Sequence, residues 1–223
     1  EDTRRDMPKL VNDLAKHHIT HLFIPYILLK NLAEYIHSLS NVSFSLEELI
    51  VAGEQLKLTE DIEVFIKKYN IDLINQYGPT ETHVVSSYTI DTTKSLFPLP
   101  PIGKPIDNTQ LYILNECRRL LPVGIPGELY IGGVQVARGY LNRSELTAEK
   151  FIADIFTEKA GAQIYKTGDL ARWLTDGNIE YIGRIDDQVK IRGYRVELGE
   201  IESVLEQHED VRQGVVLATE DSN

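Results

Sequence analysis

A group of polar residues between short apolar runs stands out in the second half of the chain. Asp169 follows a Thr-Gly pair and precedes the strand-like residues 170–174, so we predict that a bend holds its carboxylate. Thr175-Asp-Gly-Asn178 predicts a hairpin turn, because Gly and Asn accept the positive φ that such turns need. Gly183-Arg-Ile-Asp-Asp187 then places flexible and charged residues between two predicted strands. On chemistry alone, a solvated loop explains this group as well as a binding site does.

Two further stretches extend the pattern into a recognisable order of motifs. They are Asn75-Gln-Tyr-Gly-Pro-Thr-Glu81 and residues 127–141, which read GELYIGGVQVARGYL. Together with residues 165–202, they resemble the later core motifs of the adenylate-forming enzymes, and specifically the amino-acid adenylation domains of non-ribosomal peptide synthetases. The resemblance covers nearly the whole chain. It implies the later part of the large N-terminal domain and the start of the C-terminal domain.

The first 86 residues alternate between predicted helices and strands. Strands are expected at residues 19–24, 49–52 and 72–75. A helix is expected before each of these three strands. Thr59 has the position of an N-cap for the helix expected at 60–69. This alternation predicts an α/β fold with a parallel sheet. Ligands bind beyond the carboxyl ends of such strands, where Gly53 and the stretch that ends at Glu81 fall.

The pattern changes after Ser86. Short strands separated by Pro and Gly turns predict a small antiparallel, barrel-like subdomain at residues 87–184, with a helix near 145–151. Residues 185–187 are the expected hinge. Residues 188–223 are the expected start of a small α+β C-terminal domain, with a hairpin around Arg192 and Gly193.

Composition narrows the function classes. The net charge of -11, from 34 acidic and 23 basic residues, argues against a nucleic-acid partner. The single cysteine, Cys117, rules out an intrachain disulfide framework and offers no metal cluster. No apolar run approaches the roughly 20 residues of a membrane span, and the N-terminal residues lack the apolar core of a signal peptide. We therefore expect a cytoplasmic enzyme with no membrane partner.

The resemblance implies ATP and Mg²⁺ as cofactors and assigns residues to them. Glu81 is the implied Mg²⁺ ligand, and Thr80 is an implied phosphate contact. By the same resemblance, Tyr77 stacks on adenine and Asn75 forms a hydrogen bond with the edge of the base. Asp169 binds the ribose hydroxyls. The alternative for the motif that ends at Glu81 is a plain Pro-containing turn, and the alternative for Tyr77 is a core tyrosine. For Asp169 and Arg184 it is a surface ion pair, which contributes little to stability. The implied nucleotide set is Gly53, Asn75, Gln76, Tyr77, Asp169, Tyr181 and Arg184, and the implied catalytic set is Thr80, Glu81 and Arg184.

The resemblance also implies an acyl pocket and a moving domain. The pocket lining is apolar with one amide and suits a small or medium apolar amino acid. It is most similar to proline-activating pockets, except at Gln76, where His is more familiar. Asp186 matches the hinge about which the small domain swings between two arrangements. In the second arrangement, the acyl group forms a thioester with phosphopantetheine on a peptidyl carrier protein. Arg192 and Gly193 match the loop that enters the site in that arrangement. The implied pocket residues are Phe23, Ile50, Ala52, Gln76, Val84 and Val85.

Three parts of such a domain do not occur in the sequence. They are the phosphate loop ending in Pro-Lys-Gly, the Asp that holds the substrate's amine, and the distal Lys of the adenylating state. We therefore expect an excised piece of an amino-acid-activating ligase that is inactive alone. Two alternatives stay open: an acyl- or aryl-CoA ligase of the same superfamily, and a non-catalytic piece that keeps the fold.

Overall fold

The computed structural model describes residues 6–39, 42–93, 98–186, 188–191, 194–208 and 210–219. The chain divides into two compact units, Glu1–Gly183 and Arg184–Asn223. The predicted loop residues Arg192 and Gly193 lie outside the described residues.

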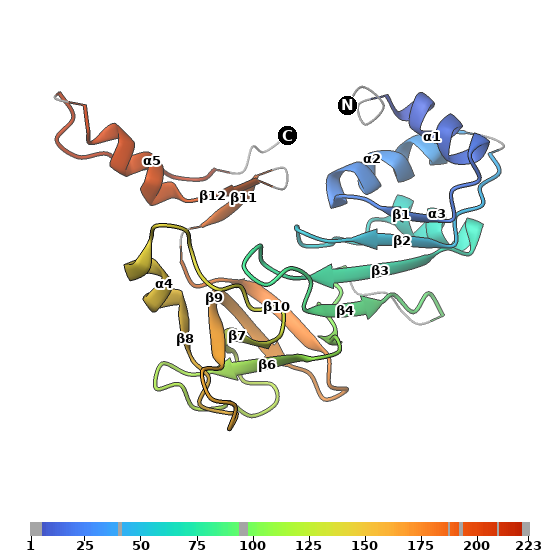
Figure 1. The fold of residues 1–223 in the computed structure, drawn as a ribbon. Helices are drawn as coiled ribbons and strands as arrows, with labels where there is room; N and C mark the ends of the chain where they lie inside the picture. The colour runs from blue at the N-terminus through green and yellow to red at the C-terminus, as the bar shows by residue number, and fades with distance from the viewer. Residues whose placement is uncertain are drawn as a thin grey trace. The chain divides into compact units, whose positions relative to one another are not determined.

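The first sheet of unit 1 has five strands in sequence order (Figure 1). The first three are parallel to one another, and the last two join antiparallel. This mixture of helices with parallel and antiparallel strands confirms the predicted α/β fold class. The strands are β1 (His21–Phe23), β2 (Glu48–Val51), β3 (Asp72–Tyr77), β4 (Ser86–Thr89) and β5 (Lys104–Pro105).

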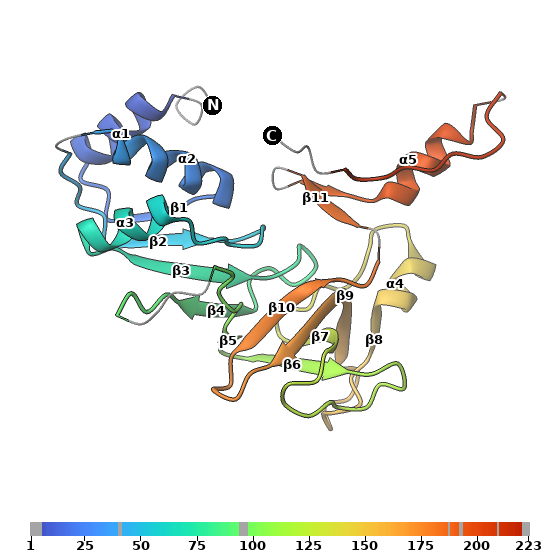
Figure 2. The ribbon, with the colours of Figure 1, turned by 180° about the vertical axis from the view of Figure 1, so that it is seen from behind.

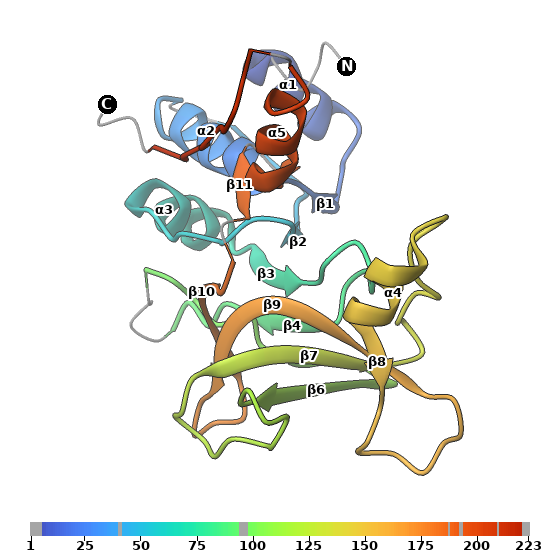
Figure 3. The same cartoon turned by 90° about the vertical axis from the view of Figure 1, so that its left-hand side faces the viewer.

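Helices α1 (Met7–Lys16), α2 (Tyr26–His37) and α3 (Glu60–Tyr69) pack on one face of the parallel strands (Figures 1 and 3). The predicted N-cap of α3 is confirmed, because the Thr59 side chain accepts a hydrogen bond from Ile62 N at 3.4 Å. Side chains alternate along a strand, so one set faces the helices and the other set faces away. The buried strand residues that pack with the helices are Leu49, Val51 and Leu73.

The second sheet is antiparallel, with the order β10-β9-β7-β6 and with β8 paired to β9 (Figure 2). Helix α4 (Ser144–Lys150) precedes β8. A second core cluster lies on this sheet. It includes Tyr77, the last residue of β3, and Val85, which lies in the loop between β3 and β4. The strands are β6 (Thr109–Leu114), β7 (Gly127–Gly133), β8 (Phe151–Ala153), β9 (Gln163–Trp173) and β10 (Ile179–Arg184).

The structure corrects the predicted start of a strand at residue 170, and the expected bend at Asp169 takes the form of a bulge within a longer strand. Strand β9 begins at Gln163 and continues through Thr167, Gly168 and Asp169 as one long strand (Figure 3). The Thr-Gly pair before Asp169 forms a β-bulge. Gly168 has φ +73, and the pairing register with β7 shifts after Glu128. Glycine adopts such a φ without the strain that a side chain brings, and bulges re-aim the neighbouring side chains.

Hydrogen bonds join the two sheets. Asn75 Nδ2 donates to the Pro101 carbonyl at 2.8 Å, and Ser86 Oγ donates to the Ile102 carbonyl at 2.7 Å. The Ile102 N–H in turn donates to the carbonyl of Ile179 in β10 at 2.8 Å. Residues 101–102 therefore connect the end of the first sheet to the edge of the second. The predicted division at residue 86 stays a prediction.

Unit 2 contains an antiparallel hairpin of β11 (Val189–Ile191) and β12 (Tyr194–Val196), followed by α5 (Leu198–Leu205). Among the helices that the structure describes in either unit, none has the length and apolar character needed to cross a membrane.

Candidate functional site

Two residues far apart in sequence meet where the sheets join. The Tyr77 hydroxyl at the end of β3 donates a hydrogen bond to Asp169 Oδ2 in β9. Both side chains are buried, with exposed fractions of 9% and 6%. Burial, and then the negative charge of Asp169, raise the pKa of Tyr77 well above its usual value. The Tyr181 ring lies 6.3 Å from the Tyr77 ring, tilted by 39°. The structure thus brings together three of the predicted nucleotide residues.

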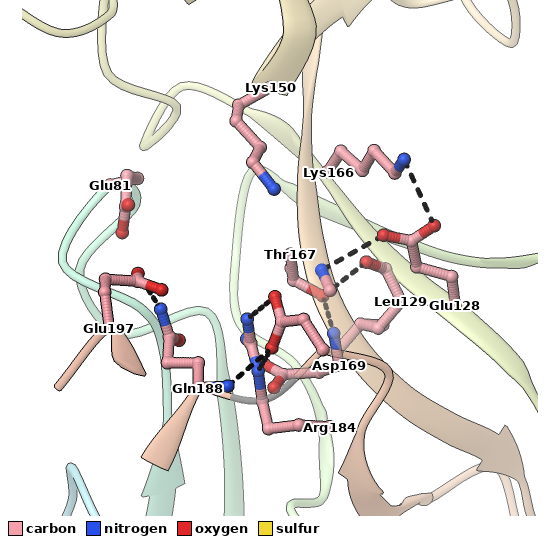
Figure 4. Close-up of polar contacts among 12 residues, drawn as sticks. Glu81, Glu128, Leu129, Lys150, Lys166, Thr167, Asp169, Arg184, Gln188 and Glu197 are labelled. Carbon is pink, nitrogen blue, oxygen red and sulfur yellow. Dashed lines mark hydrogen bonds and ion pairs between the residues drawn. The ribbon is translucent and has the colours of Figure 1, made fainter. Parts of the chain in front are cut away.

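The bulge in β9 fixes the direction of Asp169. Thr167 Oγ1 accepts from Asp169 N at 2.9 Å and donates to the Leu129 carbonyl in β7 at 2.6 Å. The Gly168 N–H donates to Glu128 Oε1 at 3.1 Å (Figure 4). Three hydrogen bonds therefore hold a strand segment of three residues and present the carboxylate to Tyr77. The sequence carries no local signal for the roles of Thr167 and Glu128, because their contacts depend on the pairing of two distant segments.

The loop after β3 is held tightly at Gly78. A Cβ added at this glycine would lie 1.8 Å from the His83 carbonyl oxygen, so no side chain fits there. The Thr82 N–H donates to the Pro79 carbonyl at 3.1 Å and closes the turn. Within this turn, Thr80 is exposed. A glycine is required here by the close approach of two backbone segments.

Glu81 is a buried carboxylate at the end of this turn, with 8% of its surface exposed. Its Oε1 accepts a hydrogen bond from the Tyr140 hydroxyl at 2.7 Å. Its backbone carbonyl accepts from Ala137 N at 2.9 Å. Carboxylate oxygen is a ligand type that Mg²⁺ prefers, so the Glu81 side chain is chemically suited to bind the predicted metal. Tyr140 lies in one of the sequence motifs, but nothing local in the sequence relates it to Glu81.

The remaining predicted nucleotide residues have different surroundings. The buried Asn75 amide is engaged with Pro101, so at least its N–H serves to join the sheets. Gly53 is exposed, with φ +90, just after β2. Because β2 and β3 are neighbouring parallel strands, Gly53 and the Gly78 turn follow carboxyl ends at the same sheet edge.

Four of the predicted pocket residues share one face of the first sheet. Phe23 pairs with Ile50 across β1 and β2, and Ala52 and Gln76 continue the same alternation past β2 and in β3. This face lies opposite the helices, and Phe23 is 60% exposed. Val85, in contrast, is fully buried in the second core cluster.

Val84 is half-buried in the turn beside Val85. Of the predicted pocket residues, only Phe23, Ile50, Ala52 and Gln76 therefore share this sheet face, and the ion pair of His21 with Glu48 lies at the other end of the same face.

In unit 2, Arg184 forms a two-pronged ion pair with Asp186. Arg184 Nε lies 2.8 Å from Asp186 Oδ1, and a terminal nitrogen of Arg184 lies 2.5 Å from Asp186 Oδ2. The Gln188 N–H also donates to Asp186 Oδ1, at 3.4 Å, and the Gln188 amide donates to Glu197. The predicted hinge residue is thus bonded to residues on both sides of it in the chain.

Comparison with known proteins gives a family match. Residues 1–141 match the family described as AMP-binding enzyme. Over 97% of its length the chain is 47% identical to gramicidin S synthase 2 of Brevibacillus brevis. Over the same share of its length, 97%, it is 46% identical to tyrocidine synthase 2 of Brevibacillus parabrevis. The chain spans only 5% and 6% of these two relatives.

Solved structures resemble the fold over nearly the whole chain. NpsA-ThdA, an artificially fused adenylation-PCP di-domain from Klebsiella oxytoca, is 27% identical with a TM-score of 0.80. The match covers 97% of this chain and 43% of that one. PA1221, which contains adenylation and PCP domains, is 24% identical with a TM-score of 0.82, over 96% and 43% of the two chains, and shares the fold.

Replacing Gly78 by alanine tests the close approach in the turn. Because the added Cβ meets the His83 carbonyl, the turn must shift, and we expect Gly78→Ala to lower the free energy of unfolding by about 1–3 kcal/mol. Urea denaturation of this chain measures the change. Gly183→Ala is the matched control, since its Cβ meets nothing within 4 Å. Equal stability of the two variants would contradict the tight turn.

Proposed function

Because the chain belongs to the AMP-binding enzyme family, we propose that it is part of a ligase that activates an amino acid with ATP. The ligase then passes the acyl group to phosphopantetheine on a carrier protein. The named relatives are peptide synthases, and NpsA-ThdA joins an adenylation domain to a PCP domain, which supports this reaction. As the chain spans 5% and 6% of these relatives, we propose that the activity belongs to a longer enzyme.

One observation carries the proposal: the contact of Tyr77 with Asp169, beside Tyr181. A flat aromatic ring and a buried carboxylate at one point suit a ligand that has a planar base and two adjacent hydroxyls. Adenosine has both. We propose that Tyr77 and Tyr181 contact the base, and that Asp169 accepts hydrogen bonds from the ribose hydroxyls.

The proposed reaction has two steps. A carboxylate oxygen of the amino acid attacks the α-phosphorus of ATP, the bond from that phosphorus to the bridging oxygen breaks, and pyrophosphate leaves. The phosphopantetheine thiol then attacks the acyl carbon, gives up its proton, and displaces AMP. For the first step we propose Thr80, the exposed residue of the turn, as a phosphate contact. Arg184 remains a predicted contact of the ribose and phosphate.

We propose Glu81 as the residue of this chain that holds Mg²⁺. The ion is usually held by one or two carboxylates together with substrate phosphates, and Glu81 supplies one buried carboxylate. When bound, Mg²⁺ would neutralise charge on the phosphates. The turn closed by Gly78 and Thr82 keeps Glu81 at the carboxyl end of β3, where ligands bind in such sheets.

For the substrate, we propose an amino acid with a small or medium apolar side chain, and proline is one candidate. Phe23, Ile50, Ala52 and Gln76, toward the carboxyl ends of the strands, support this class, since these four residues carry apolar groups and one amide but no charge. A charged side chain beside these residues would lose hydration without a partner of opposite charge.

Glu81→Gln in the complete enzyme tests the metal role. The substitution keeps the shape of the side chain but removes its negative charge. We expect the rate of amino-acid-dependent pyrophosphate exchange to fall. The fall should correspond to a loss of roughly several kcal/mol of transition-state stabilisation. The exposed Glu116 provides the control variant Glu116→Gln. Exchange at the wild-type rate in Glu81→Gln would exclude the assigned role.

Asp186→Pro tests the proposed hinge. The chain divides into its two units between Gly183 and Arg184, close to this residue, which supports a pivot there. Proline fixes φ near about -65° and restricts the preceding residue, so one domain arrangement should be favoured. We expect transfer to the carrier protein to fall more than pyrophosphate exchange, measured on one preparation.

The control for this variant is Asp186→Ala, which removes the ion pair with Arg184 but leaves the backbone free. It should affect the two half-reactions equally. Equal losses for Asp186→Pro at an unchanged melting temperature would count against Asp186 as the pivot.

A further inference from the structure

We propose that Tyr140 is a positioning residue for Glu81, which orients the carboxylate that is to hold Mg²⁺. This inference rests on the proposed function of Glu81. It assigns a role to the segment Ala137–Tyr140, which lies far from Glu81 in sequence. The role is to fix a metal ligand from the neighbouring loop, without contact between Tyr140 and the substrate.

The segment holds Glu81 at two points. The Tyr140 hydroxyl donates to Glu81 Oε1 at 2.7 Å, and the Ala137 N–H donates to the Glu81 carbonyl at 2.9 Å. One bond therefore fixes the side chain and the other fixes the backbone of the same residue. A glutamate side chain has three rotatable bonds, so a backbone contact alone does not set the direction of its carboxylate.

Tyr140 is itself held from helix α4. Its backbone N–H donates to Thr147 Oγ1 at 2.9 Å, and this hydroxyl donates to the Arg143 carbonyl at 2.8 Å. Gly139, just before Tyr140, has φ +135, and an added Cβ would lie 2.3 Å from the Thr147 side chain. The backbone at Gly139, next to Tyr140, thus approaches Thr147 of α4 more closely than a residue with a side chain allows.

The half-buried ring of Tyr140 is also held by two aromatic neighbours. It packs edge-to-face on Phe151, with ring centres 5.4 Å apart and planes at 72°. Its hydroxyl lies 3.4 Å from the hydroxyl of Tyr165, which is almost fully buried in β9. With both the backbone and the ring fixed, the phenol hydroxyl has a defined direction, and this direction is toward Glu81.

Such a contact matters for metal affinity. Ligating carboxylates are commonly hydrogen-bonded by outer residues, and removing such a partner typically lowers metal affinity or activity about 10- to 100-fold. A phenol suits the task because it donates one hydrogen bond and stays neutral beside a carboxylate. A lysine or arginine at this position would instead compete with the metal by its positive charge.

Tyr140→Phe in the complete enzyme tests the inference. Mn²⁺ binding is measured by electron paramagnetic resonance, in the presence of an ATP analogue whose α–β bridge is a methylene. We expect the Mn²⁺ dissociation constant to rise about 10-fold, because Phe keeps the ring but loses the donor. Tyr112→Phe is the matched control: Tyr112 stacks on Phe156, remote in sequence from the turn, and should leave Mn²⁺ affinity unchanged.

The outcomes separate this inference from the proposed function. If Glu81→Gln weakens Mn²⁺ binding but Tyr140→Phe does not, the positioning role is overturned and the metal role stands. If Glu81→Gln also leaves Mn²⁺ binding unchanged, the metal role fails and the inference fails with it. A thermal melt accompanies each variant.

Thr147→Val keeps the inference testable if Tyr140→Phe lowers the melting temperature. It removes the hydroxyl that holds the Tyr140 backbone, whereas Thr147→Ser keeps a hydroxyl there. Weaker Mn²⁺ binding in Thr147→Val, restored in Thr147→Ser, supports the positioning role. Equal and unchanged binding in both overturns it.

Discussion

The buried hydrogen bond between Tyr77 and Asp169 is the constraint on which the site depends. It joins residues 92 positions apart, one at the end of the first sheet and one in the bulge of β9. Leaving either polar group buried without its partner would cost about 1–3 kcal/mol, and more for the charged one. The end of β3 and the bulge of β9 must therefore stay together, and the Asn75–Pro101 contact holds the same junction.

A second connection between the same two segments lies close to this one in sequence. Glu81 follows Tyr77 by four positions, and Tyr165 precedes Asp169 by four in β9. Tyr140 stands between them, bonded to Glu81 and close to the Tyr165 hydroxyl. Phenol and carboxylate groups thus link the two segments at two points. In the proposed reaction, Tyr77 and Asp169 contact the nucleoside and Glu81 holds the metal.

Local features were predictable from the sequence because they depend on neighbouring residues. Thr59 caps α3 through a contact three residues away, and the apolar period of that helix identifies its buried face. Asp169 stands out in the sequence as a constrained residue, but the long strand that runs through it has no local signal, because Gly168 forms a bulge only against β7. The bond from Tyr140 to Glu81 spans 59 positions and has no local signal. The roles of the site residues were derived from resemblance and remain proposals.

Amino-acid-dependent exchange of pyrophosphate into ATP, by the complete enzyme, tests the central claim most directly. The panel contains small, medium, large and charged amino acids, with fatty and aromatic carboxylic acids plus coenzyme A as the alternative substrates. We expect exchange with a small or medium apolar amino acid, proline among the candidates, and little with charged ones. Exchange with none of the amino acids, together with thioester formation from a carboxylic acid and coenzyme A, would contradict it.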